Sequence, residues 1–308
     1  MSQVVHRLGQ SYLLVALAAL VFGLTVPGVA GLLSPYSTFF LSVVFFLTAL
    51  KVDFKEVASY LRDWRMVLET NALMLVVFPA VVYYVMLVAK PELALPFLIL
   101  AAMPTAMAAP LIAELLGGRQ SLALVATVTT SLLAPLTVPF VLSLLAGAQV
   151  VVPFGSMFIS LAKVIFLPFA LAEVVKYIWP RLSTKVSLVS SPLSVVLLGA
   201  IIAAVSARQA PAIIGSLSGG QTLRWLGWLM LLFAAFHVLG YWAIFWRPVR
   251  DRFTISLCLT YMNFLLAIYL ADTFFPQAAV TVPVILSVVP WTIFLPLSGL
   301  AARKLIKI

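Results

Sequence analysis

The chain has 308 residues, of which 64% are hydrophobic and 9% are charged, and its formal net charge is +10. Soluble domains contain roughly 45–50% apolar and about 25% charged residues, so this composition excludes one or two ordinary soluble domains. A membrane span takes about 20 apolar residues, which leaves room for about ten spans. The composition therefore predicts an all-α polytopic membrane protein.

Ten apolar runs are expected to cross the membrane. In chain order they are 11–32, 35–50, 66–88, 94–116, 120–146, 153–178, 186–206, 222–246, 253–273 and 277–301. The start of the chain lacks a convincing small-residue cleavage site, so the first run is interpreted as a membrane helix and not as a signal peptide. The charged segment 51–65 is predicted to be an interfacial connector.

The basic residues predict the orientation of these spans. With the N-terminus inside, 15 of the 19 lysines and arginines fall on the inner side, while only Lys90, Arg208 and Arg224 fall on the outer side. Cytoplasmic loops carry such an excess, so we expect both termini in the cytoplasm and the protein in the cell (inner) membrane. Topology explains the positive charge, and no nucleic-acid partner is expected.

Ten spans favour two halves of five within one transporter domain, roughly 1–150 and 151–308. The sequence LAPL at 133–136 and the sequence FLPL at 294–297 lie 161 residues apart, in spans 5 and 10. An odd number of spans in each half would give the halves opposite orientations. The pattern thus predicts an inverted repeat.

Span 4 has two prolines near its centre. Pro104 and Pro110 each remove a backbone donor and clash with the preceding turn, and they bracket Thr105. A helix broken in the membrane frees backbone groups that transporters use for substrate and ion sites. A simple kink is the alternative interpretation.

Span 5 adds two hydroxyl groups to this region. Thr127 and Ser131 share one helical face. Proximity to the span 4 break is what makes Thr127 of interest. The alternative is that such hydroxyls bond only the carbonyl four residues earlier.

Span 6 contains Lys163, about ten residues from its start and therefore near the bilayer centre at about 1.5 Å per residue. An ammonium there usually faces a cavity or a partner, so Lys163 is predicted to bind a substrate carboxylate or to titrate during transport. A shifted span boundary or a snorkelling side chain would explain it without a function. His237 and Glu69 are weaker candidates.

Span 9 has a polar centre formed by Thr260, Tyr261 and Asn263. An asparagine amide in hydrocarbon needs partners, so these residues are candidates for substrate binding. The alternative is a hydrogen bond that only holds neighbouring helices together. No proline forces a break in this span.

Other chemistry finds little support. The single cysteine, Cys258, excludes an intramolecular disulfide and a cysteine zinc cluster. There is no HExxH motif, no aspartate pair suited to magnesium and no convincing nucleophile–base pair. No cofactor or metal is expected, and an enzyme is not favoured.

Two segments resemble the bile acid:sodium symporter family: SLALVATVTTSLLAPLTVP at 121–139 and ISLCLTYMNFLLAIYLA at 255–271. In the second, Asn263, Leu266 and Ala267 match the family's span 9 pattern. The resemblance implies a panel domain of spans 1, 2, 6 and 7 and a core domain of spans 3–5 and 8–10, with spans 4 and 9 unwound and crossing near mid-membrane. It also implies transport of organic anions and similar solutes by alternating access, commonly with sodium.

Most sodium ligands that the resemblance implies are missing. The family's oxygen ligands fall here on Met74, Ala109, Pro110, Ala123, Thr127, Cys258 and Met262. Of these side chains only Thr127 offers a ligand oxygen of the family's kind, and a hard cation needs several oxygens. Sodium coupling is therefore not expected.

The sequence as a whole predicts a secondary transporter of a small anionic organic solute in the lipid bilayer. The predicted substrate residues are Lys163, Asn263, Thr105, Tyr261 and Thr260. Proton coupling and facilitated exchange stay open. The alternatives are a sodium-dependent symporter of the same fold, a channel or receptor, and an intramembrane enzyme. The sequence does not indicate an oligomeric state.

Overall fold

The computed structural model describes residues 2–52 and 64–306, and within them the chain folds into helices without any strand. The elements of the first half are α1 (Ser2–Thr25), α2 (Pro27–Ala30), the 3₁₀ helix η1 (Gly31–Tyr36), α3 (Ser37–Ala49), α5 (Trp64–Ala72), the π-helical segment η2 (Leu73–Val77), α6 (Phe78–Ala89), α7 (Pro91–Ala101), α8 (Ala109–Leu115) and α9 (Gln120–Ala146). Those of the second half are α10 (Phe154–Ile178), α11 (Pro180–Arg208), α12 (Ala210–Ser218), α13 (Gln221–Ala243), α14 (Val249–Thr260), α15 (Phe264–Phe274), α16 (Ala278–Leu286) and α17 (Val288–Leu305).

Seven of the described helical segments are long and apolar enough to cross a membrane. They are Pro27–Ala49, Trp64–Ala89, Gln120–Ala146, Phe154–Ile178, Pro180–Arg208, Gln221–Ala243 and Ala278–Leu305. Three shorter apolar helices are Leu14–Thr25, Pro91–Ala101 and Phe264–Phe274. The predicted all-α membrane protein is thereby confirmed, and most predicted spans match a helix within a few residues.

Two predictions for the N-terminal part need comment. The first span was predicted to continue to residue 32, but α1 ends at Thr25 because Pro27 disfavours a helical conformation at Val26, whose φ and ψ are −128° and 58°. The short elements α2 and η1 then lead into α3. The predicted interfacial connector falls largely on residues 53–63, which lie outside the described residues.

Two helices are discontinuous. Between α7 and α8 the chain leaves the helical path from Ala102 to Ala108, and between α14 and α15 it does so from Tyr261 to Asn263. Pro104 lies in the first gap, whereas Pro110 occupies the first turn of α8, where its missing N–H has no partner to lose. The break predicted in span 4 and the one that the family resemblance implied in span 9 are both present.

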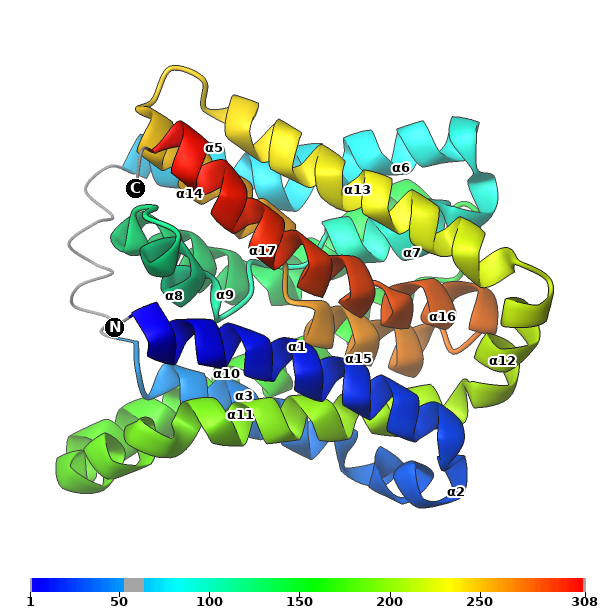
Figure 1. The fold of residues 1–308 in the computed structure, drawn as a ribbon, viewed down its shortest axis with the longest axis horizontal. Coiled ribbons are helices and arrows are strands. Elements are labelled where there is room, and N and C mark those ends of the chain that lie inside the picture. Colours follow the sequence, from blue (N-terminus) through cyan, green and yellow to red (C-terminus); the bar gives the residue numbers. More distant parts are fainter. Residues whose placement is uncertain (1, 53–63, 307–308) are drawn as a thin grey trace.

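The helices form two groups (Figure 1). Helices α1, α3, α10 and α11 pack against one another along one side of the molecule, while α5, α6, α13, α14 and α17 lie along the other. The chain ends labelled N and C lie at the same end of the molecule. We call this end the N/C end, and the end that carries α12 the α12 end.

Candidate functional site

The two discontinuous helices meet where both are unwound. Thr105 and Met262 form an isolated antiparallel β-bridge, flanked by hydrogen bonds from the Ala106 N–H to the Tyr261 carbonyl (2.8 Å) and from the Asn263 N–H to the Pro104 carbonyl (2.7 Å). Buried backbone groups must be paired in a membrane, and here N–H groups in each break donate to carbonyl groups in the other. We call this contact the crossing.

Side chains explain why span 9 breaks without a proline. The Asn263 side-chain oxygen accepts a hydrogen bond from the Leu266 N–H at 3.1 Å, so Asn263 is the N-cap of α15. Asparagine is among the best N-cap residues because it satisfies an N–H that the helix leaves free. Asn263, a predicted substrate residue, therefore starts a helix inside the span.

A cavity of about 480 Å³ leads to the crossing. Its walls come from α3, α8, α11, the starts of α9, α15 and α17, and the two breaks. The polar residues of its lining are Thr48, Lys51, Gln120, Ser121, Ser190, Ser191, Ser194 and Asn263. Among the described lining residues only Lys51 carries a formal charge, so the cavity is mildly positive.

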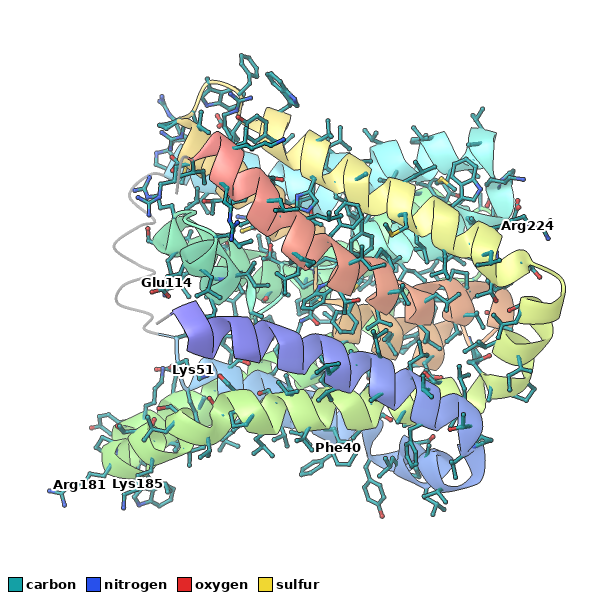
Figure 2. All side chains as sticks on the ribbon, viewed as in Figure 1. Phe40, Lys51, Glu114, Arg181, Lys185 and Arg224 are labelled. Carbon is teal, nitrogen blue, oxygen red and sulfur yellow. The ribbon has the colours of Figure 1, made fainter. Side chains whose placement is uncertain are left out.

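Lys51 follows the last turn of α3, and its Nζ donates a hydrogen bond to Ser191 Oγ on α11 at 2.6 Å. Desolvation by partial burial lowers the pKa of the Lys51 ammonium. In Figure 2 Lys51 and Glu114 both lie at the N/C end, whereas Arg224 lies at the α12 end. The cavity thus runs inward from the N/C end.

At the α12 end, α15 and the residues after it make polar contacts to α10 and α11. Arg208 at the end of α11 forms an ion pair with Asp272 of α15, whose side chain is 10% exposed. Ser160 and Tyr269 share a hydrogen bond between α10 and α15. Gln209 Nε2 also donates to the Pro276 carbonyl at 3.3 Å.

A second cavity, of about 300 Å³, lies among these contacts. Its lining residues are Ser34, Ser37, Thr38, Ile201, Val205, Arg208, Tyr269, Asp272 and Thr273. The crossing residues Thr105 and Asn263 do not line it, in contrast to the first cavity, which contains Asn263.

The structure brings together four of the five predicted substrate residues. Thr105, Thr260, Tyr261 and Asn263 all lie at the crossing, but only Asn263 lines the cavity. Thr105 is fully buried, with its backbone N–H 3.2 Å from Thr130 Oγ1, and Thr260 bonds the Ser256 carbonyl within its own helix. These two residues lie buried at the crossing and do not line the cavity.

Lys163 is the exception. Its side chain is exposed on α10, on the same face as Ile159, Phe166 and Leu167, and it does not line the cavity. Apolar exposed neighbours are what a lipid-facing helix surface presents. The structure thus corrects the prediction that Lys163 faces the substrate cavity, and Lys51 is the cation found there.

A buried hydrogen-bond chain escaped prediction. His237 Nδ1 lies 3.0 Å from Ser256 Oγ, His237 Nε2 lies 3.1 Å from Ser298 Oγ, and Ser298 Oγ lies 2.9 Å from the Tyr261 hydroxyl. The chain links α13, α14 and α17 to the crossing. Each polar residue was visible in the sequence, but nothing there showed that they lie together.

The family model described as "Sodium Bile acid symporter family" matches residues 38–216, from α3 to α12. The chain belongs to this family. No curated protein matches the chain closely enough to count as a relative. Membership in the sodium bile acid symporter family makes the chain an integral membrane protein of the transporter class.

The structure allows a test of sodium binding, which the family name implies. At the positions of the family's ligands, Met74, Ala123, Cys258 and Met262 are buried and offer no ligand oxygen, and Thr127 Oγ1 is a single buried hydroxyl without a partner. No group of three or more His, Cys, Asp or Glu side chains gathers among the described residues. A hard cation needs several oxygens, so these side chains do not fit a sodium ion.

Proposed function

We propose that this chain is a secondary transporter that moves a small organic anion by alternating access, without sodium coupling. The observation that carries the proposal is the asymmetry of its two ends: the cavity at the N/C end reaches the crossing, while the cavity at the α12 end lies among ion-pair and hydrogen-bond contacts to α15 and does not reach it. Alternating access requires such a path, open to one side at a time.

An inverted repeat supports this mechanism. An offset of 157 residues relates the bridge residues Thr105 and Met262. The same offset maps Pro91 onto Pro248 and Gln120 onto Gln277. We prefer this register to the 161-residue offset of the LAPL and FLPL match, because the latter displaces the helix starts by about one turn.

With ten spans arranged in this way, both termini lie in the cytoplasm and the cavity opens inward. Helices α1, α3, α10 and α11 then correspond to the panel, and the remaining spans form the core. The excess of basic residues at the N/C end supports this orientation.

The cavity supports the choice of solute. A volume of about 480 Å³ lies within the usual range for small-molecule sites, and the walls combine apolar side chains with hydroxyls and one cation. A lone ammonium in a partly apolar cavity favours an anion over a cation or a neutral solute. The coupling ion is not sodium, because the side chains at the sodium positions do not fit it.

Counterflow in proteoliposomes tests the proposal. Protein reconstituted with an unlabelled organic-anion mixture inside should accumulate a labelled anion of that mixture transiently, at equal rates in sodium and choline buffers. A channel would only equilibrate the label, and a receptor would not move it. Either result would contradict the proposed carrier, and a steep sodium dependence would contradict the absence of sodium coupling.

A further inference from the structure

Two stretches of the chain repeat each other without a gap. Ser34, Pro35, Ser37 and Leu41 recur 157 residues later as Ser191, Pro192, Ser194 and Leu198. The stretches end on basic residues at the same spacing, Lys51 and Arg208. The first covers η1 and α3, and the second is the C-terminal part of α11.

The packing of these helices places each serine pair beside the basic end of the other stretch. Helices α3 and α11 contact each other and run in opposite directions (Figure 1). The first cavity accordingly contains Lys51 with Ser191 and Ser194. The second contains Arg208 with Ser34 and Ser37.

The two matching sets differ in one respect, the presence of a carboxylate. In the second cavity Asp272 pairs with Arg208, and both residues line the cavity. In the first, the hydrogen bond that Lys51 makes to a described side chain goes to the neutral hydroxyl of Ser191, and none of the four ion pairs found between described residues includes it. A cation with two hydroxyls beside it offers the donors that a carboxylate oxygen accepts.

We propose that Lys51, Ser191 and Ser194 form a carboxylate-binding site at the N/C end, the counterpart of the Arg208 site that Asp272 fills. The proposal rests on the proposed function and extends it to the solute group that is recognised. Two sources can supply the carboxylate. One is the solute, which enters the cavity, and the other is Glu114 in the last turn of α8, at the same end of the molecule (Figure 2).

Glu114 belongs to the comparison because of its place in the fold. Helices α8 and α15 each follow a break, and the 157-residue offset brings Glu114 within one residue of Asp272. The Glu114 side chain is exposed and forms none of the ion pairs found between described residues. A shift of α8 toward α11 would therefore bring the Glu114 carboxylate to Lys51. The resulting pair would match the pair of Asp272 with Arg208.

The first arm of the test measures binding of hexanoate and of its neutral counterpart hexanamide to the purified full-length protein by isothermal titration calorimetry. Wild-type protein should bind hexanoate and not hexanamide. Lys51→Met should weaken hexanoate binding by about tenfold or more, and Ser191→Ala by about threefold, as expected for a charged and a neutral hydrogen bond. Lys163→Met is the matched control, because it removes an exposed lysine outside the cavity, and it should bind as wild type does.

The second arm detects Glu114 at the site. Cys258 is the only cysteine and is fully buried, so a Cys258→Ala background accepts a new pair, Lys51→Cys with Glu114→Cys. An oxidative cross-link between them, absent from a Lys163→Cys and Glu114→Cys control, would identify Glu114 as an occupant.

The outcomes separate clearly. Hexanoate binding that Lys51→Met abolishes identifies the solute as a source, and a cross-link without hexanoate binding identifies Glu114. Wild-type-like binding by Lys51→Met, or neither binding nor cross-link, overturns the site. Loss of counterflow with Lys51-dependent binding intact would overturn the proposed transport and leave the carboxylate site standing.

Discussion

The N/C end and the α12 end of α3 and α11 are built from similar residues, yet only the cavity at the N/C end reaches the crossing. Both have a Ser-Pro-x-Ser stretch facing a basic side chain. At the α12 end Asp272 meets the basic residue, and Tyr269 of the same helix adds a hydrogen bond to Ser160. The two ends thus differ in the carboxylate that the short helix after the break supplies: Asp272 of α15 meets Arg208, while no carboxylate of the described residues meets Lys51.

The largest effect is expected when Asp272 loses its charge. Asp272→Asn removes the ion pair to a half-exposed arginine, a loss of about 1–2 kcal/mol between the values for exposed and buried pairs. We expect N-ethylmaleimide to modify a Val205→Cys reporter in the second cavity about tenfold faster in a Cys258→Ala background. Glu92→Gln, which breaks the exposed Lys90–Glu92 pair, is the control and should leave the rate unchanged.

A carboxylate installed at the N/C end should close the cavity there. Leu115 on α8 is the exact counterpart of Asp272 at the 157-residue offset and is 37% exposed. Leu115→Asp is expected to pair with Lys51 and to slow modification of a Thr48→Cys reporter by about fivefold, as expected for a partly exposed ion pair. Leu115→Asn has the same shape without the charge. Equal slowing by both variants would contradict an ionic cause.

Loss of the Asn263 side chain, which caps α15 at the crossing, is expected to have a smaller effect. Asn263→Ala removes the acceptor for the Leu266 N–H and should lower the free energy of unfolding by about 1 kcal/mol, or the melting temperature by a few degrees. Asn263→Ser should recover most of the loss, because serine also caps helices. No recovery would show that the amide acts through a contact other than the cap.

The smallest effect is expected from sodium. Replacing sodium by choline should change the modification rates of the Thr48→Cys and Val205→Cys reporters by less than about twofold, since the side chains at the family's sodium positions lack the oxygens that a hard cation needs. A rate at either end that follows sodium concentration would contradict this expectation and indicate backbone ligands.

The sequence predicted the helices and the break in span 4 well, because apolar length and the proline at 104 act locally. The break in span 9 was open to prediction only from the family resemblance. Asn263 caps α15 within an apolar run, and whether an asparagine there caps a helix or joins two helices depends on the Pro104 backbone 159 residues away, to which it donates.

The predicted site failed at Lys163 for a physical reason. Depth along a span follows from counting residues, but direction around the helix does not. The exposed face with Phe166 and Leu167 is as apolar as the buried face with Leu161 and Ile165, since lipid and protein interior are alike in polarity. Lys51 lay at a predicted helix end, where basic residues are common, so only the structure revealed that it lines a cavity.

Helix α11 has a mechanical consequence as a single unbroken element of 29 residues. It carries Ser191 in the first cavity and Arg208 in the second, 17 residues or about 25 Å apart along its axis. A stiff rod that pivots between its ends moves them in opposite directions, as a lever does. A carboxylate bound at the proposed site beside Ser191 would then affect the Arg208–Asp272 ion pair without touching it, and by thermodynamic reciprocity that ion pair would affect the affinity for the carboxylate equally.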